Sequence, residues 1–534
     1  MLSPFSDFQE RRYGHFAWFL LLIAAFFFVV RVFFWNIPME RDEGEYATLG
    51  LGMLHGIPPF QEAYTMKLPG GAAMYALIFA VLGHSARAIH VGLTFFNAAT
   101  IVGVGWMTWR LFGKAASCFA AAAYGTWTLG FGMFGLWLSA EHFAAFFLVA
   151  GCCAMPLPRE RWYFGRFAAG SLLLGCAWIM KQHALLPAMA SLLFLGWRAQ
   201  RQKPVLGVAM GIAFFLIPFF MTCLVMRLLG VWTPFKFWTF TYASRYVSNV
   251  PWRLGWEYAK IGLTQVFWSG PLLWLLAGIG FFRVAFRPRI SPDGSSRGFL
   301  VVAFLFSVAA ASLGWMFRGQ YFILVAPFAA MLAGAGWIFL WARWYDRRLR
   351  VMLAIVSALA AFLPLMEPMA WAARRDPIGV MRLVYGMNPF PEYGVVAQYV
   401  REHTRPDDRL AILGSEPSIY FLADRRPALP YLCVYEMMKR HAFARKMQQE
   451  AARAIETARP ACIIWVEAPT SWGAGPESDP GFVKWAAHYV RVNYTLEGVL
   501  DLVSERETVV RWNAAARTHL SQSPYRILIY AKKA

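Results

Sequence analysis

Apolar runs of membrane-spanning length recur along the first 370 residues of the chain, separated by short polar loops. An α-helix needs about 20 predominantly apolar residues to cross the hydrocarbon core of a bilayer. Hydrophobic residues make up 58% of the 534 residues, charged residues make up 15%, and the mean hydropathy is +0.44. A soluble globular protein carries more charge and fewer apolar residues than this. The sequence therefore predicts an α-helical polytopic membrane protein.

We expect eleven membrane-spanning segments, near residues 16–35, 88–109, 116–137, 141–157, 167–181, 184–197, 204–227, 261–284, 298–316, 321–343 and 350–370. The apolar piece 68–83 is shorter, and counting it as a span would put every later basic loop on the outer side. We therefore interpret it as an interfacial or re-entrant helix. Basic residues then mark the cytoplasmic side and place the N-terminus there: Arg11, Arg12 and the loops at 110–114, 159–166, 198–203, 283–297 and 343–350.

The composition changes after residue 370. Short apolar strands alternate with helix-like segments, which predicts a small α/β domain. The strands are expected at 410–413, 462–466 and 525–530, and the helices at 391–404, 436–458 and 480–490. The chain thus divides into a transmembrane module, residues 1–370, and a C-terminal domain, residues 371–534, which eleven spans place outside the cytoplasm. In an oxidising compartment, Cys433 and Cys462 can form a disulfide.

The net charge of +21 raises the question of nucleic-acid binding. Lys and Arg lie mainly in the short loops between apolar runs, so we interpret the excess as a signal of topology and of contact with anionic lipids. We expect no nucleic-acid partner. No Gly-rich turn of a nucleotide-binding type opens a helix in the C-terminal domain, and no Cys/His spacing indicates a zinc site.

Polar residues interrupt the apolar pattern in four loops that the predicted topology puts on one membrane face. They are Asp42, Glu43, Tyr64, Lys67, Glu141, His142, Lys181, His183, Arg318, Gln320 and Tyr321. Each has a structural alternative, because an acid can cap a helix, a lysine can snorkel and an arginine can anchor at the interface. Glu45 is expected to point away from Asp42 if the chain turns helical at Gly44. The convergence of acids and cations is the stronger signal, since charge near a bilayer is costly.

Two carboxylates from different loops, together with several cations, suit the transfer of a group from a phosphate-linked donor. A carboxylate takes the proton from an attacking hydroxyl as general base. Lys and Arg neutralise a leaving phosphate, whose charge grows in the transition state. The 24 Trp, 21 Tyr and 46 Phe residues exceed what a helical core needs. They fit aromatic belts at the interfaces and a groove for a long isoprenoid tail.

At these positions the sequence resembles the GT-C superfamily of membrane glycosyltransferases, in particular the bacterial protein O-mannosyltransferase and aminoarabinose (lipid A) transferase group. The resemblance covers nearly the whole chain. It rests on Arg41-Asp42-Glu43-Gly44-Glu45-Tyr46-Ala47, Tyr64-Thr65-Met66-Lys67-Leu68-Pro69, Glu141, Arg318-Gly319-Gln320-Tyr321-Phe322 with Pro327, and residues 395–426 with Pro406-Asp407-Asp408-Arg409 and Ile419-Tyr420. Met66 stands where lipid A transferases carry an acid, and Gln320 replaces the usual His.

The resemblance implies a GT-C fold and an inverting transfer of a sugar from a polyprenyl-phosphate donor to a hydroxyl or phosphate of a lipid, glycan or protein acceptor. It implies that Asp42 is the catalytic base and Glu141 a second acid. Donor-phosphate contacts would be Lys67, Arg318, Tyr64 and Tyr321, and candidate substrate contacts are Glu43, His142, Lys181 and His183. No cofactor is certain, and a divalent metal ion is left open. The expected location is a bacterial inner membrane, with the C-terminal domain in the periplasm.

Two other functions are compatible with the sequence. A transporter or flippase of a lipid-linked or acidic solute needs ionisable groups near mid-membrane that are reachable from both sides, and the chain has no internal repeat. An O-antigen-type ligase uses a pyrophosphate-linked donor and favours a large basic outer loop. The predicted loop 228–260, with Lys236, Arg245 and Arg253, keeps that alternative open.

Overall fold

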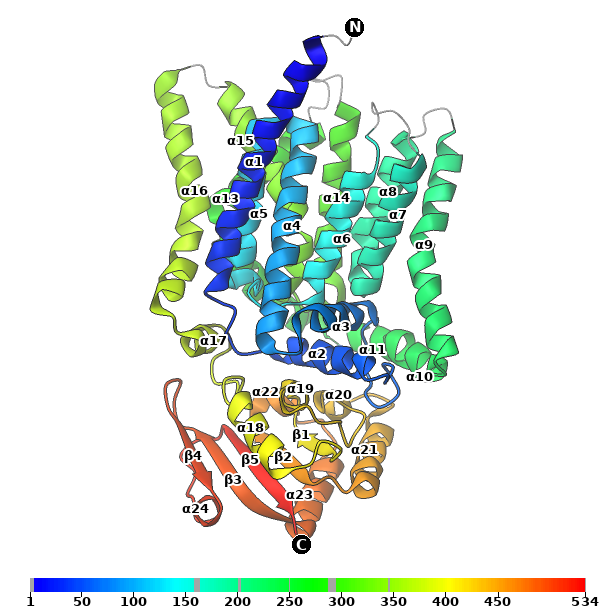
Figure 1. The fold of residues 1–534 in the computed structure, drawn as a ribbon, viewed down its shortest axis with the longest axis vertical. Coiled ribbons are helices and arrows are strands. Elements are labelled where there is room, and N and C mark those ends of the chain that lie inside the picture. Colours follow the sequence, from blue (N-terminus) through cyan, green and yellow to red (C-terminus); the bar gives the residue numbers. More distant parts are fainter. Residues whose placement is uncertain are drawn as a thin grey trace.

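The computed structural model describes residues 4–157, 164–199, 203–248, 250–286, 294–343 and 346–533. Figure 1 shows a bundle of long helices above a smaller domain that contains a β-sheet. Several basic residues that set the predicted topology lie outside the described residues: Arg159, Arg161, Arg201, Arg287, Arg289 and the side chains of Arg11 and Arg12.

The bundle consists of helices that run roughly side by side (Figure 1). Their bounds are α1 (Pro4–Val32), α4 (Ala86–Phe112), α5 (Lys114–Leu129), α6 (Ala140–Ala154), α7 (Phe164–Met180), α8 (Leu185–Ala199), α9 (Pro204–Leu228), α13 (Pro271–Phe286), α14 (Gly294–Ser312), α15 (Ala326–Arg343) and α16 (Arg347–Arg374). In the described part of the chain, five helices are long and apolar enough to cross a membrane, or up to six if a bent pair counts as one span. The mostly helical, apolar architecture agrees with the predicted class.

Each of the eleven predicted spans overlaps a helix, but the number of membrane crossings stays a prediction. The prediction of a continuous span at 261–284 is wrong. Helix α12 (Trp252–Trp268) and helix α13 meet at an angle of 97°. Pro271 lacks the N–H that would continue the helix, and a Cβ on Gly270 would lie 2.9 Å from Nε1 of Trp127. The bend leaves α12 free to line a cavity at the end of the bundle.

Helices α2 (Arg41–Leu54) and α3 (Gly70–Leu82) lie across the lower end of the bundle in Figure 1. They pack closely, since a Cβ on Gly50 would lie 2.9 Å from the carbonyl oxygen of Ala72. The expectation that the segment 68–83 forms a helix separate from the bundle agrees with this position. The same layer contains α10 (Trp232–Lys236), a π-helical turn (Phe237–Tyr242) and α11 (Ala243–Ser248).

The C-terminal domain contains a five-stranded sheet with strand order β1-β2-β5-β3-β4. Strands β1 (Leu410–Leu413) and β2 (Cys462–Glu467) are parallel, and β5 (Arg526–Lys532), β3 (Tyr494–Leu502) and β4 (Thr508–Trp512) pair antiparallel. The α/β prediction agrees with this sheet, but β3 and β4 were not predicted because acids and Arg511 interrupt their apolar pattern. Cys433 and Cys462 are both buried and free.

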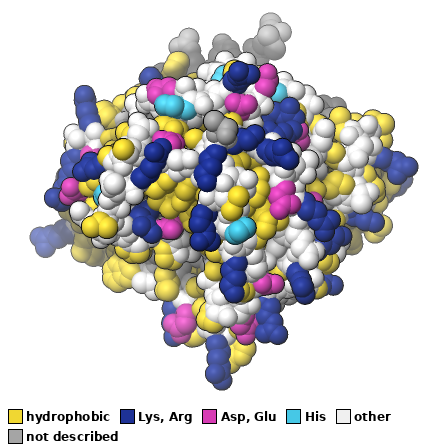
Figure 2. Space-filling view, turned by 90° about the horizontal axis from the view of Figure 1, so that it is seen from below, with side chains coloured by type: hydrophobic (Ala, Val, Ile, Leu, Met, Phe, Trp, Pro, Cys, Tyr) yellow, Lys and Arg dark blue, Asp and Glu magenta, His cyan; other side chains and the backbone are white. Residues whose placement is uncertain are grey.

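The helices of this domain are short. They are α17 (Pro377–Tyr385), α18 (Tyr393–His403), α19 (Ser418–Ala423), α20 (Tyr435–Met438), α21 (Ala444–Ala458), α22 (Pro469–Trp472), α23 (Gly481–Asn493) and α24 (Ala514–Arg517). The single helix predicted at 436–458 is therefore two helices. Figure 2 shows the face of the molecule below the bundle, where Lys and Arg side chains are spread among apolar ones rather than gathered in one patch.

The C-terminal domain is fixed directly to helix α2. The hydroxyl of Ser418 donates to the carbonyl oxygen of Glu40 (3.0 Å), and the hydroxyl of Thr48 donates to that of Pro417 (3.0 Å). A Cβ on Gly44 would lie 2.2 Å from Oγ of Ser418. Only glycine therefore lets helix α19 approach α2 this closely.

Candidate active site

Helix α2 begins with a capping box that fixes the direction of its first turn. The carboxylate of Glu40 accepts from the backbone N–H groups of Asp42 (2.8 Å) and Glu43 (2.7 Å), and Oε2 of Glu43 accepts from the N–H of Glu40 (3.3 Å). Burial, with the charges of Asp42 and Glu43, raises the pKa of Glu40 to about 8. The reciprocal bonds hold Asp42 and Glu43 on different sides of the helix.

Asp42 and Glu45 share one cation. Nζ of Lys67 lies 2.8 Å from Oδ1 of Asp42 and 2.8 Å from Oε2 of Glu45, and Thr65 donates to Oε1 of Glu45 (2.5 Å). The expectation that Glu45 points away from Asp42 is wrong, because residues three apart on a helix lie on the same face. Burial would raise the pKa of Asp42, but the charges of Lys67, Lys181 and Arg318 outweigh it and hold that pKa below its ordinary value. Asp42 is therefore ionised at neutral pH.

A second acid lies in the same layer, paired with residues that follow α7. Glu141, at the start of α6, is fully buried, and its Oε1 lies 3.0 Å from Nζ of Lys181 and 3.8 Å from Nε2 of His183. The ring of Tyr321 contacts both bases, with centroid distances of 5.0 Å to the His183 ring and 5.7 Å to Nζ of Lys181. Burial lowers the pKa of His183 to about 4 despite the nearby charge of Glu141, so this histidine is neutral. Glu141, Lys181, His183 and Tyr321 thus form one cluster.

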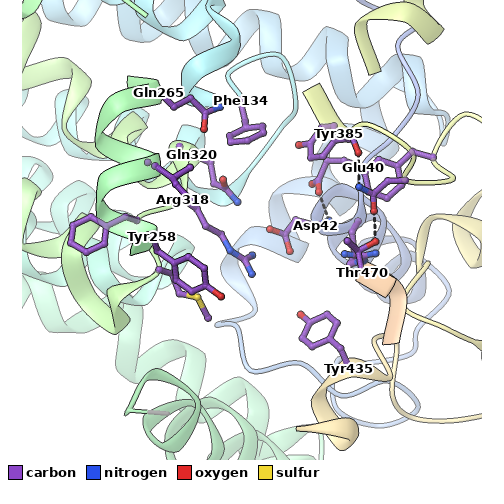
Figure 3. Close-up of a pocket in the computed structure, with 18 residues that line it drawn as sticks. Glu40, Asp42, Phe134, Tyr258, Gln265, Arg318, Gln320, Tyr385, Tyr435 and Thr470 are labelled. Atoms are coloured by element: carbon purple, nitrogen blue, oxygen red, sulfur yellow. Dashed lines mark hydrogen bonds between the residues drawn. The ribbon is translucent and has the colours of Figure 1, made fainter. Parts of the chain in front are cut away.

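A cavity of 360 Å³ opens beside Asp42, between the helical bundle and the C-terminal domain. Its lining includes Glu40, Asp42, Phe134, Tyr258, Gln265, Phe317, Arg318, Gln320, Tyr385, Asn388, Phe390, Tyr435 and Thr470. Figure 3 shows Asp42 and Arg318 pointing toward each other across it. Within the described residues, the side chain of Arg318 makes no hydrogen bond or ion pair, and it is exposed to the cavity. A carboxylate and an unpaired guanidinium therefore face the same space.

Arg318 is aimed by an irregular loop that packs on α12. Three residues before it adopt positive φ values: Gly314 (75°), Trp315 (56°) and Phe317 (42°). A Cβ on Gly262 of α12 would lie 2.0 Å from the carbonyl oxygen of Phe317. The glycine in α12 therefore lets the helix seat the loop directly, and left-handed residues at such loops are typical of functional sites.

A second, apolar cavity of 560 Å³ is lined in part by residues that neighbour Lys67 and Lys181 in the sequence. Its wall includes Pro69 and Gly70, which follow Lys67 closely, and Met180, which precedes Lys181. The remaining lining comes from the end of α2 and the loop after it, from α3, from the end of α7 and from α9 with the residue that follows it, and includes Met53, Ile57, Ala73, Met74, Ile179, Pro218, Met221, Val225, Met226 and Leu229. Its composition suits a hydrocarbon chain.

Three of the predicted site residues lie elsewhere. Glu43 is buried on the bundle side of α2, where it accepts from Nε2 of His90 (3.2 Å) and from the N–H of Leu138 (2.6 Å). Tyr64 donates to Glu450 of the C-terminal domain (3.0 Å). His142 lies within α6, with its Nδ1 3.3 Å from Oγ of Ser139. None of these three lines the cavity around Asp42. Five other predicted site residues do not line it either, although Lys67 pairs with Asp42 and the rest form the Glu141 cluster: Lys67, Glu141, Lys181, His183 and Tyr321.

Sequence reasoning missed most of the cavity wall. The i, i+3 spacing of Asp42 and Glu45 indicates that both side chains lie on the same face of a helix. Tyr258, Tyr385, Asn388, Tyr435 and Thr470 carry no charge and follow no periodic pattern, so only the folded chain brings them together.

The described residues contain no group of three or more His, Cys, Asp and Glu side chains arranged to hold a metal ion. The carboxylates of Asp42 and Glu45 already have the ammonium group of Lys67 between them. That pair therefore does not fit a metal in this arrangement.

No protein-family profile and no curated protein matches the sequence. Solved structures match its fold. ArnT from Cupriavidus metallidurans, solved with undecaprenyl phosphate, gives a TM-score of 0.60 at 13% identity and covers 97% of this chain and 98% of that one. The oligosaccharyltransferase AglB from Archaeoglobus fulgidus, solved with an inhibitory peptide and a dolichol-phosphate, gives 0.54 at 14% identity, over 97% of this chain and 75% of that one. Both are GT-C proteins, so the predicted GT-C fold is confirmed.

Proposed function

We propose that this chain, which has the GT-C fold, is an inverting glycosyltransferase that moves a sugar from a polyprenyl-phosphate donor to an acceptor hydroxyl. The observation that carries the proposal is the ionised Asp42 facing the unpaired Arg318 across one cavity (Figure 3). The glycosyltransferases that share the fold support the reaction class.

In the proposed step, Asp42 accepts the proton of the acceptor hydroxyl as its oxygen forms a bond to the anomeric carbon of the donor sugar. The bond between that carbon and the phosphate oxygen breaks, and polyprenyl phosphate leaves with the electron pair. Arg318, on the opposite side of the cavity, compensates the charge that develops on the phosphate. A base and a leaving group on opposite sides of the sugar give inversion.

Lys67 has a different role in this proposal from the one that the sequence suggests. Both carboxylates beside it already pair with its ammonium group, so its main effect is to keep Asp42 ionised. The cluster of Glu141, Lys181, His183 and Tyr321 borders the same layer and orients the donor or acceptor.

The apolar cavity beside Pro69 and Met180 is the proposed seat of the isoprenoid tail. ArnT was solved with undecaprenyl phosphate and AglB with dolichol-phosphate, which supports a lipid-phosphate donor. We propose a bacterial inner membrane as the location, with a cytoplasmic N-terminus, a transmembrane module of residues 1–370 and a periplasmic domain of residues 371–534. The charged groups of the site gather at one end of the bundle, which favours an enzyme over a transporter.

The test uses the full chain purified into lipid nanodiscs and a set of undecaprenyl-phosphate-linked pentoses and hexoses, with cell-envelope extract as acceptor. The expected result is release of undecaprenyl phosphate from at least one donor by the wild type and loss of release in Asp42→Asn. The matched control is Asp479→Asn, an exposed carboxylate of the C-terminal domain, which should behave as wild type. Equal release by Asp42→Asn and the wild type would refute the assignment of the base.

A further inference from the structure

The cavity between Asp42 and Arg318 has two chemically different sides. The Arg318 side is built by the helical bundle, with Phe134, Tyr258 and Gln265. The Asp42 side is built mainly by residues after position 370, namely Tyr385, Asn388, Phe390, Tyr435 and Thr470. Figure 3 shows Tyr385 and Thr470 beside Asp42, across the cavity from Arg318. Because the base must touch the acceptor, the acceptor occupies the Asp42 side.

We propose that this side of the cavity binds a sugar ring without charge, so that the acceptor of the reaction is a neutral carbohydrate. The inference rests on the proposed function and deepens it.

The charges on the Asp42 side oppose an anionic acceptor. Among the described residues, the only guanidinium there is that of Arg41, which the C-terminal domain holds: its Nε donates to the carbonyl oxygen of Ser415 (2.5 Å), and its Nη2 pairs with the buried Glu416 (3.4 Å). The other charged group of this wall in the described chain is the carboxylate of Asp42, because burial raises the pKa of Glu40 to about 8 and leaves that carboxyl largely protonated at neutral pH. A phosphate placed on this side would meet the carboxylate of Asp42 and no unpaired cation, since Arg318 belongs to the opposite wall, and this is unfavourable for binding.

The wall offers instead the two kinds of contact that a sugar ring uses. Tyr385 is half-buried and held by neighbouring rings, with centroid distances of 4.9 Å to Trp137 and 5.1 Å to Phe390. A fixed aromatic ring provides a large apolar surface for the C–H face of a pyranose. The same wall supplies uncharged polar groups for the hydroxyls.

Those polar groups are fixed in place. The hydroxyl of Thr470 donates to Oδ1 of Asn388 (2.6 Å), and Nδ2 of Asn388 donates to the carbonyl oxygen of Tyr385 (2.6 Å). A hydroxyl has two acceptor positions and a carboxamide has two donor hydrogens, so both side chains keep hydrogen-bonding capacity for sugar hydroxyls. The pair joins the segment after α17 to helix α22 at the edge of the cavity.

The size of the cavity agrees with this class of ligand. Its 360 Å³ is near the lower end of the range of about 300–1,000 Å³ for small-molecule sites. It therefore suits sugar-sized groups beside Asp42 and Arg318 better than a protein loop.

The binding test uses saturation-transfer NMR to detect ligands bound to the full chain in nanodiscs. Neutral methyl glycosides, the matching sugar phosphates and a serine-containing peptide are the separate probes. We expect ring-proton signals from at least one methyl glycoside, loss of those signals in Tyr385→Ala, and retention in Tyr385→Phe. Tyr489→Ala, which removes a stacked tyrosine of α23 far along the C-terminal domain, is the control. Signals only from the phosphates or the peptide, or equal signals in Tyr385→Ala, overturn the proposal.

The turnover test separates this inference from the proposed function. With a donor that the wild type consumes, we expect transfer to the methyl glycoside, a KM for the glycoside raised at least tenfold in Tyr385→Ala and Asn388→Ala, and a donor KM changed less than twofold. Donor consumption with transfer to phosphate or peptide acceptors alone overturns the carbohydrate acceptor and leaves the enzyme assignment standing. Consumption of no donor refutes the proposed function, while the NMR result still decides the ligand class.

Discussion

The two sides of helix α2 carry adjacent carboxylates with opposite surroundings. On the cavity side, Asp42 retains 20% side-chain exposure, pairs with Lys67 and faces Arg318. On the bundle side, Glu43 has 0% exposure and accepts from His90, Leu138 and Glu40. One acid keeps free acceptor positions next to open space, whereas the other has used them for the fold. Position relative to the cavity, rather than residue type, therefore separates the acid proposed to react from the structural one.

The largest expected effect tests the cavity side directly. Asp42→Asn removes the group proposed to take the acceptor proton, while an amide of the same shape remains. Since general-base catalysis contributes about 10²–10⁴-fold, we expect kcat to fall by that factor with the melting temperature nearly unchanged. Steady-state release of polyprenyl phosphate and differential scanning fluorimetry measure the two quantities. A large fall in melting temperature would show that Asp42 belongs with Glu43 as a structural acid.

The next effect concerns the cation that faces Asp42. Arg318→Ala removes the charge proposed to compensate the leaving phosphate, and losing one such donor costs about 10²–10³-fold in kcat. Arg318→Lys should restore some of the activity, because a lysine supplies the charge without the planar fork. Turnover at saturating donor is the measurement. A wild-type kcat in Arg318→Ala would indicate that a different cation of the site contacts the phosphate.

A smaller effect is expected when the charge of Lys67, the cation that pairs with Asp42, is removed. The charge of Lys67 holds the pKa of Asp42 down against the effect of burial, so Lys67→Gln should raise that pKa. In the proposed mechanism activity requires ionised Asp42, and the acidic limb of the profile of kcat/KM against pH should therefore shift to higher pH. The loss should be larger at about pH 5.5 than at about pH 8, since more of the raised carboxyl is protonated at the lower value. An equal loss at both values would assign Lys67 to substrate binding instead.

The smallest effect on turnover is expected on the bundle side. Glu43→Gln replaces an anion that pairs with His90 and weakens the hydrogen bond from the N–H of Leu138. We expect a loss of about 1–3 kcal/mol in stability, as for a buried polar group left partly unsatisfied, with kcat per folded molecule little changed. Chemical denaturation in detergent gives the first quantity and active-site-normalised turnover the second. A kcat as low as that of Asp42→Asn would erase the distinction between the two sides.

Much of the fold is predictable because membrane helices are recognisable by their length. The apolar run that becomes α4 needs no tertiary information, and the separate helix at 68–83 follows from the sides on which Arg and Lys residues must lie. The break between α12 and α13 was not predicted, although Gly270 and Pro271 mark it. Two apolar helices joined by a short break have the same average hydropathy as one continuous span.

The site is predictable only where it is charged. Asp42, Glu141, Lys181 and Arg318 interrupt apolar segments, so the sequence alone indicates them. Tyr385 and Thr470 were not predicted, because aromatic and hydroxyl side chains are common in loops and their role depends on contacts between distant segments. Glu43 is the converse case. The sequence predicts it as a substrate contact because it is charged and follows Asp42, but its side chain is turned toward His90 in the bundle.

The seating of α19 on Gly44 has a consequence for the order in which the protein becomes functional. A ribosome synthesises Asp42 and Arg318 well before Tyr435 and Thr470. A nascent chain therefore carries both charged groups before the residues after position 370 have completed the cavity wall. Under the proposed function, a chain that ends after α16 would lack the wall proposed to hold the acceptor and would leave the donor unreacted.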